Sequence, residues 1–271
     1  MKTKQTLRVR SQKEIADGIF DLRLQYTDRD RIPDNVLPGQ FVNVYPRDAS
    51  ALLPRPISIC GFERQEGILR LVYRRVGKGT AEFSRLAEGD FLDVLGILGN
   101  GYDPAVLAGR NVLLIGGGIG APPLLGLAKR LAAQERQEGK GSVTSVLGYR
   151  TDDLFLKEEF EACGRVIAAT DDGTAGFHGN VVSAAAAVFP AGGSIDAVCA
   201  CGPLPMLRGV KQLARKLRAT CYVSLEERMA CGVGACLGCV TRTTGTDEHS
   251  HVRNARVCTE GPVFNAEEVE L

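Results

Sequence analysis

The sequence has almost no net charge, and it has no long apolar run that is free of glycine and proline. Its 271 residues carry 33 Lys and Arg against 32 Asp and Glu, a formal charge of +1. No global field of either sign exists to attract nucleic acid or anionic lipid, so we expect neither as a partner. The longest uncharged apolar stretch, residues 111–128, contains five glycines and two adjacent prolines. It predicts a strand, a turn and a helix start rather than a membrane span.

The first residues also lack the apolar core of a signal peptide, so we expect a cytoplasmic protein. Nine cysteines in a reducing compartment favour metal or redox chemistry over disulfides. The composition, 44% hydrophobic and 24% charged, is that of an ordinary globular chain. The length suggests two domains and a small additional module.

Residues 1–102 are β-rich and predict a small antiparallel barrel of six strands, with a short helix at 80–86. The expected strands, separated by Gly or Pro, cover residues 7–10, 19–26, 41–45, 57–60, 68–72 and 91–95.

From residue 103 to 225, apolar strands alternate with helical segments, which predicts an α/β domain with a parallel sheet. The expected strands are 111–115, 143–147, 166–169, 197–200 and 221–224, and the main helices 122–137 and 204–217. Residues 226–271 are rich in Gly and Cys and have no periodic pattern long enough for a core of their own. We expect them to form a third, small module.

Four cysteines in this last module form C-x4-C-x2-C-x18-C: Cys231, Cys236, Cys239 and Cys258. The first three have the spacing of plant-type [2Fe–2S] ferredoxins, with a fourth ligand further along. Gly232, Gly234 and Gly238 lie between them, where the backbone must approach the sulfurs closely. The pattern favours a [2Fe–2S] cluster.

Two alternatives remain for these cysteines. A four-cysteine zinc site is one, although Cys258 has no second cysteine beside it to make the usual short knuckle. Free buried thiols are the other. His249 and His251, between the last two cysteines, could complete a mixed site, but they stand in a polar, solvated segment.

Two segments of the predicted barrel suit a flavin dinucleotide. Arg55, Pro56, Ile57 and Ser58 open a strand, and the arginine can offer a fork of donors to a pyrophosphate. The second runs from Tyr73 and Arg74 through two glycines to Gly79 and Thr80, where the threonine can cap a helix whose N-terminus attracts anions. An edge strand with a surface arginine and a plain strand–turn–helix junction are the structural alternatives.

The predicted α/β domain carries a nucleotide signal. Gly116, Gly118 and Ala121 fit G-x-G-x-x-A between a buried strand and a helix, and Gly120 lies in the same turn. No acidic residue ends the second strand, where Tyr149-Arg150 stands, so this motif does not decide between NADH and NADPH. A glycine turn that only permits close packing is the alternative.

Further candidate NAD contacts end later strands, because ligands of open α/β sheets bind at that edge. They are Asp171, Cys201 and Gly202. Cys201 could pack against a nicotinamide ring or be a small buried thiol.

In this order, residues 55–58 (RPIS), 76–80 (VGKGT), 116–123 (GGGIGAPP) and 201–203 (CGP) resemble the ferredoxin–NADP reductase superfamily. Residues 226–232 (EERMACG) and 257–264 (VCTEGPVF) resemble more specifically the electron-transfer subunits of NAD-dependent (type B) dihydroorotate dehydrogenases. Two departures stand out: Ile57 replaces a tyrosine that often stacks on the flavin in the superfamily, and the segment between Cys239 and Cys258 is longer than usual.

The resemblance implies which residues hold the cofactors. FAD would be bound by Arg55, Pro56, Ile57, Ser58, Val72, Tyr73, Arg74, Gly79 and Thr80, and a [2Fe–2S] cluster by the four cysteines. The partner would be an FMN-containing catalytic subunit that oxidises dihydroorotate in pyrimidine (UMP) biosynthesis, in a heterotetramer of two plus two. Electrons would cross the cluster singly, collect on FAD and leave as hydride to NAD⁺.

Two other functions stay open at this point. A related reductase subunit would share the fold and cofactors but serve ferredoxin, hydrogenase or sulfite reductase. A zinc-stabilised nucleotide-binding regulator would have no redox role.

Overall fold

The computed structural model describes residues 3–192, 194–246 and 251–271, and its N-terminal part is a closed six-stranded antiparallel barrel. The strands follow one another around the barrel in the order β1-β2-β5-β4-β3-β6. Their bounds are β1 Lys4–Ala16, β2 Ile19–Gln25, β3 Phe41–Tyr45, β4 Arg55–Glu63, β5 Ile68–Arg74 and β6 Phe91–Leu98, with a 3₁₀ turn at Arg29–Arg31 and helix α1 at Lys78–Phe83. All six predicted strands are therefore confirmed.

The second part is a seven-stranded sheet in the order β10-β9-β8-β7-β11-β12-β15. The strands are β7 Asn111–Gly117, β8 Ser142–Tyr149, β9 Arg165–Thr170, β10 Phe177–His178, β11 Ala197–Cys201, β12 Thr220–Ser224 and β15 Val263–Asn265. All pairs are parallel except β12 with β15. The predicted parallel sheet is confirmed, and the chain reverses its direction of winding between β7 and β11.

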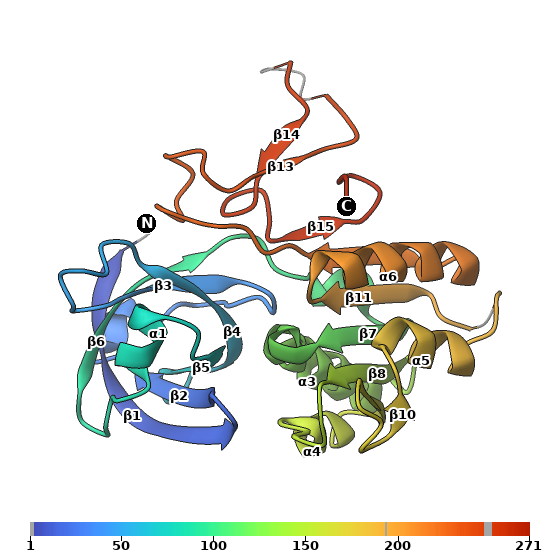
Figure 1. Cartoon of the computed structure of the whole chain (residues 1–271), viewed down its shortest axis with the longest axis horizontal. Coiled ribbons are helices and arrows are strands. Elements are labelled where there is room, and N and C mark those ends of the chain that lie inside the picture. The colour runs from blue at the N-terminus through green and yellow to red at the C-terminus, as the bar shows by residue number, and fades with distance from the viewer. Residues whose placement is uncertain (1–2, 193, 247–250) are drawn as a thin grey trace.

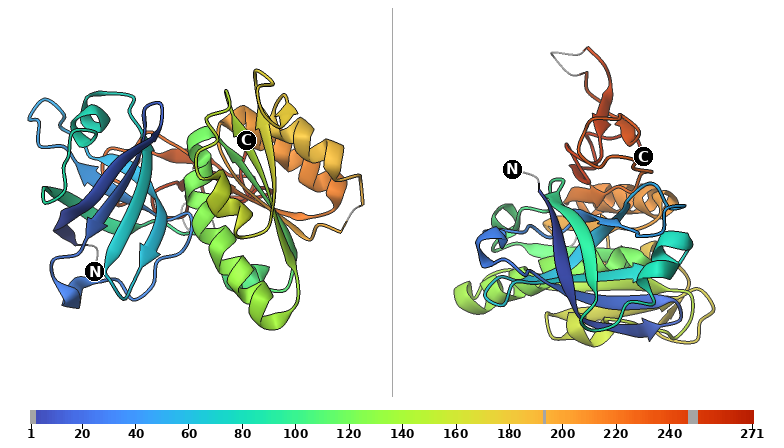
Figure 2. Two further views of the ribbon diagram at one scale, coloured as in Figure 1. Left: turned by 90° about the horizontal axis from the view of Figure 1, so that it is seen from below. Right: turned by 90° about the vertical axis from the view of Figure 1, so that its left-hand side faces the viewer.

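Helices cover both faces of this sheet. Those nearest the barrel are α3 (Ala121–Glu138), α4 (Lys157–Glu161) and the short α2 (Pro104–Leu107), whereas α5 (Val181–Val188) and α6 (Leu204–Leu217) lie on the far face. Figure 1 and Figure 2 show α3 between the barrel and the sheet. None of the described helices is long and apolar enough to cross a membrane.

The last module is not separate from the sheet. After β12 the chain leaves the α/β domain, forms the hairpin of β13 (Val240–Arg242) and β14 (Asn254–Arg256), and returns as β15 beside β12. The hairpin projects beyond both larger parts (Figure 1). Residue 226 as a boundary stays a prediction, but β15 belongs to the sheet in space.

The barrel and the sheet meet across an apolar layer and a buried ion cluster. Ile19, Cys60 and Val72 of the barrel share a core with the buried side of α3. Beside it, the Arg70 guanidinium of β5, 9% exposed, makes paired hydrogen bonds of 2.8–3.0 Å to Asp21 within the barrel.

The same guanidinium also makes paired bonds of 2.7 and 2.8 Å to Glu159 of α4, and Lys129 of α3 lies 2.6 Å from that carboxylate. Burial opposes the charge on Glu159, but the hydrogen bonds from Arg70 and Lys129 outweigh it and lower its pKa to about 2. The carboxylate therefore stays charged at any pH near neutrality, and the two domains are held by a fully paired set of charges.

We predict that Arg70→Met lowers the free energy of unfolding by about 3–5 kcal/mol, because it leaves the mostly buried Asp21 without its cation and Glu159 with Lys129 alone. Urea denaturation followed by circular dichroism measures the loss. Arg64→Met is the matched control, since the Arg64–Asp34 pair is 61% and 93% exposed and such pairs contribute about 0–1 kcal/mol. Equal losses in the two variants would contradict the assignment.

Candidate functional site

The four clustered cysteines lie close together. Cys231 interacts with Cys236 as a first pair and Cys258 with Cys239 as a second, and Cys258 also lies near Cys231. Among the residues that the structure describes, no three Cys, His, Asp or Glu side chains converge closely enough to hold a single metal ion. Four thiols in this arrangement suit the two irons of a [2Fe–2S] cluster, each of which takes two protein ligands.

The β13–β14 hairpin explains how distant residues form the second pair. Val240 is paired with Arg256, and the Val257 N–H donates to the Cys239 carbonyl at 2.9 Å. Cys239 and Cys258 therefore flank the open end of this ladder, where the chain enters and leaves the hairpin, although 18 residues separate them. His251 is exposed and His249 lies outside the described residues, so a histidine ligand stays without support from the structure.

Backbone N–H groups surround the first pair. Val233 and Cys236 each direct an N–H at the Cys231 sulfur at 3.4 Å, and Gly238 does the same for Cys236. Burial alone would raise the pKa of Cys231, but these donors lower it to about 6, which favours the thiolate that metal binding needs. Burial raises the pKa of Cys258 to about 11. The residues present fit the cluster.

The ligands differ in exposure. Cys239 and Cys258 are buried, whereas Cys236 is exposed and the next residue, Leu237, is 62% exposed. The Cys236 edge of the site therefore faces solvent.

The two predicted FAD segments meet on the barrel. A β-carbon on Gly79 would lie 2.8 Å from the Arg55 side chain, so the guanidinium rests on the bare backbone at the start of α1. The helix begins at Lys78 rather than at the predicted residue 80, with Gly77 as its N-cap. Thr80, in the first turn, accepts hydrogen bonds from the N–H groups of Val76 and Gly77 and so stabilises the helix start from inside the helix. This cradle suits the phosphates of a dinucleotide.

Strand β4 presents alternate side chains to two surroundings. Ile57 packs against the barrel core, whereas Cys60 packs on the opposite face toward α3. Pro56 and Ser58 share that outward face, because side chains alternate along a strand. Ile57 therefore points away from a ligand bound outside the barrel, in keeping with its departure from an aromatic residue.

Two predicted FAD residues can act only through their backbone. Val72 is 3% exposed in the layer between the domains, and Tyr73 is 2% exposed. The Tyr73 ring stacks on Phe20, and its hydroxyl donates to Gln12 inside the barrel.

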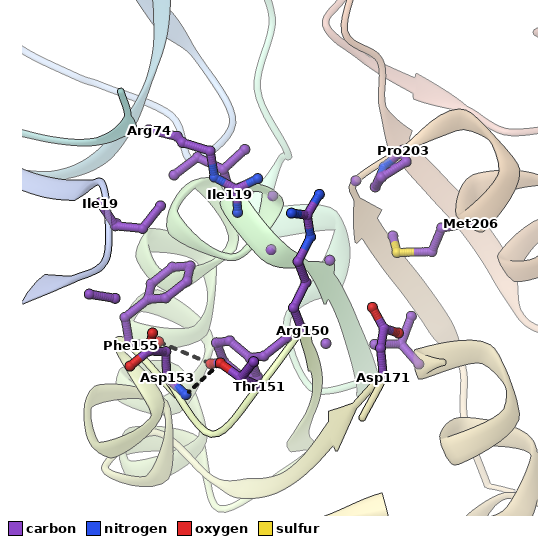
Figure 3. A pocket seen from close by; sticks show the side chains of 18 of the residues that line it. Ile19, Arg74, Ile119, Arg150, Thr151, Asp153, Phe155, Asp171, Pro203 and Met206 are labelled. Carbon is purple, nitrogen blue, oxygen red and sulfur yellow. Dashed lines mark hydrogen bonds between the residues drawn. The ribbon is translucent and has the colours of Figure 1, made fainter. Parts of the chain in front are cut away.

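A cavity of about 700 Å³ opens between the barrel and the carboxyl ends of the parallel strands. It spans the point between β7 and β11 where the winding reverses, which is where open α/β sheets bind ligands. Of the predicted residues, Arg74, Gly118, Gly120, Asp171 and Gly202 line it. Figure 3 shows Arg74 reaching into it from the barrel and Arg150 from the sheet.

The remaining predicted residues lie elsewhere. Gly116 and Cys201 are behind the cavity wall: a β-carbon on Gly116 would meet Ala121 at 3.0 Å, and Cys201 is 2% exposed. Burial raises the pKa of the Cys201 thiol to about 12. Its contact with a nicotinamide stays a prediction.

Four of the lining residues that sequence reasoning left unassigned have side chains of chemical interest: Arg150, Phe155, Met206 and Glu226. For Arg150 a signal existed, because it directly follows β8, at the edge where ligands bind. Phe155 and Met206 lie outside the motifs, and Glu226 opens the segment 226–232, whose resemblance was used only for the cluster module. With Arg74 and the N-terminus of α3, Arg150 gives the cavity cationic groups that suit a pyrophosphate.

Comparisons with known proteins decide the family. Residues 226–270 match the iron–sulfur cluster binding domain of dihydroorotate dehydrogenase B. The "Dihydroorotate dehydrogenase B (NAD(+)), electron transfer subunit" of Bacillus caldolyticus is 42% identical over 99% of both chains, and that of Enterococcus faecalis (strain OG1RF) 41% identical over 96% of both. This chain belongs to that family.

Solved structures agree. The NADH-dependent reduced ferredoxin–NADP oxidoreductase, described in work on flavin-based electron bifurcation, superposes with a TM-score of 0.83 at 30% identity, covering 97% of this chain and 89% of the other. The Amycolatopsis cytochrome P450 reductase GcoB gives 0.65 at 25% identity, over 80% and 67%. The predicted family and fold are confirmed, as is the oxidoreductase class.

We predict that Cys236→Ala loses iron but keeps FAD, because the flavin segments lie on the barrel and the cysteine at the outer edge of the cluster loop. Metal analysis and flavin extraction of the purified variant measure both. Cys163→Ala is the control, since that thiol is buried beside Phe160, bonded to the Glu159 carbonyl, far along the chain from the four ligands. Loss of FAD with retention of iron would contradict the two-site assignment.

Proposed function

We propose that this chain carries electrons from the FMN of a dihydroorotate dehydrogenase catalytic subunit, through a [2Fe–2S] cluster and FAD, to NAD⁺. The observation that carries the proposal is that one chain combines a four-thiol site with a dinucleotide cleft. The cleft lies where the winding of the parallel sheet reverses. The close relationship to electron transfer subunits over almost the whole chain supports it. The setting would be cytoplasmic pyrimidine (UMP) biosynthesis, in a heterotetramer of two such chains and two catalytic subunits.

The residues divide this work among three regions, with domains at 1–102, 103–225 and 226–271. Cys231, Cys236, Cys239 and Cys258 would hold the cluster, and its exposed edge would face the partner. The barrel would hold FAD through the side chains of Arg55, Ser58 and Arg74, with Pro56 and Ile57 shaping the strand. The backbone of Val72, Tyr73, Gly79 and Thr80 would complete that site.

The sheet would hold NAD⁺. Gly116, Gly118 and Gly120 would form the turn under the pyrophosphate, and Asp171 and Gly202 would line the cleft, with Cys201 behind Gly202. Bound FAD supplies the exchange between one-electron and hydride chemistry. The protein's own task is to position the cofactors and tune them.

A related reductase subunit is the second candidate. The structural similarity to an NADH-dependent reduced ferredoxin–NADP oxidoreductase favours it, because that protein shares nearly the whole length of the fold. In that case ferredoxin, hydrogenase or sulfite reductase would replace the catalytic subunit as redox partner.

The complex purified anaerobically tests the proposal. We expect FAD and two irons per chain, an FMN-containing partner, and reduction of NAD⁺ when dihydroorotate is added, followed at 340 nm. A complex that ignores dihydroorotate but exchanges electrons with ferredoxin would favour the second candidate. A colourless, zinc-containing protein would overturn both, because flavin and cluster absorb visible light.

A further inference from the structure

The cluster module is built directly on the outward face of one barrel strand. Phe41 of β3 packs with Cys239, Val257 and Cys258 in one buried core. Two residues on, and therefore on the same face, Asn43 donates from Nδ2 to the carbonyl of Cys231 at 2.9 Å. One face of this strand thus shares a buried core with Cys239 and Cys258 and hydrogen-bonds the carbonyl of Cys231.

Asn43 is fitted closely to the cluster loop. It is fully buried, and its Oδ1 has no hydrogen-bond partner within the described parts of the chain. A β-carbon on Gly232, which has φ of +66°, would lie 2.4 Å from the Asn43 amide nitrogen. The loop keeps a bare backbone where the amide lies against it. Burying an acceptor without a donor is unfavourable. The favourable interaction that offsets this cost is the single hydrogen bond of the amide, which goes to the carbonyl of the ligand residue Cys231.

Asn43 also adjoins the flavin segment. It stands directly opposite Pro56 in the β3–β4 ladder, and Phe41 stands opposite Ser58. Directly opposed residues of an antiparallel pair have neighbouring side chains on the same face. The outward face of these two strands therefore leads from Ser58 and Pro56, assigned to FAD, through Asn43 to Cys231.

A second asparagine provides a comparison. Asn100, just after β6, donates from Nδ2 to the Glu260 carbonyl at 3.0 Å, and its N–H donates to the Gly261 carbonyl at 2.6 Å. It fastens the same module to the same barrel, but it touches no cluster ligand.

We propose that Asn43 is a positioning residue that fixes the Cys231 side of the cluster against the flavin strand and thereby sets the rate of electron exchange between cluster and FAD. The inference rests on the proposed function. In the direction of that function, two electrons cross the cluster one at a time to FAD, which also takes up one proton from water. The two electrons and that proton then leave as hydride to NAD⁺. In the reverse direction NADH would give a hydride to FAD; one of its two electrons would pass to the oxidised cluster, and the other would stay on the flavin. This flow needs only NADH and this chain with its cofactors.

The test is anaerobic stopped-flow reduction of the full chain, loaded with FAD and cluster, by NADH. Flavin absorption reports hydride transfer, and electron paramagnetic resonance of freeze-quenched samples reports the cluster. For Asn43→Leu, similar in shape but unable to donate, we expect an unchanged flavin phase. Cluster reduction should slow severalfold, because the rate of electron transfer falls as the separation of cluster and flavin grows. Asn43→Ser, which keeps a donor, should lie between.

Asn100→Ala removes a comparable amide–carbonyl bond and should leave both phases unchanged, because no ligand moves. A cluster phase at the wild-type rate in Asn43→Leu, with full iron and FAD, would overturn the proposal. So would loss of iron in both Asn43 variants, which would assign the residue to cluster assembly, or equal slowing in Asn100→Ala. If NADH fails to reduce the flavin of the wild-type chain, the proposed function fails instead.

Discussion

The charge-paired contact of Arg70 with Asp21 and Glu159 is the constraint on which the cleft depends. Asp21 follows Ile19 on the strand that forms one wall, and Glu159 lies in the helix that follows Phe155 on the opposite wall. One planar guanidinium with two pairs of bonds therefore fixes both walls at once. A cofactor on the barrel can exchange hydride with one on the sheet only if this separation is held.

The cluster module is likewise held in a fixed position by contacts with the rest of the chain. It is fastened to the outward face of β3 rather than placed on a flexible tail, and β15 returns its chain to the sheet. Short rigid elements therefore fix the position of the four thiols relative to both domains. The buried pair, Cys239 and Cys258, faces the molecule, and the exposed Cys236 faces outward. This order of exposure suits a protein that receives electrons at the exposed edge of the cluster and passes them toward its interior.

Sequence patterns predicted what depends on periodicity and motif. Strands such as β5 and β7 are buried almost throughout and the helix α6 buries one regular stripe, so their positions follow from local residues. The cysteine spacing identified the cluster. Arg70 was missed because a charged residue in an alternating strand is ordinarily solvent-facing. Asn43 was missed because nothing local marks a partner 188 residues away. β13, β14 and β15 have three residues each, too few for a pattern, and only pairing defines them.

The hairpin inside the cluster loop also has an entropic consequence. Because β13 and β14 pair next to Cys239 and Cys258, the chain beyond them is a side loop whose ends are already joined. The cost of closing such a loop rises only with the logarithm of its length, by about 0.6 kcal/mol for each doubling. Residues can therefore be gained or lost at this tip with little effect on the cluster, so the family can lengthen the protein here without rebuilding its electron path.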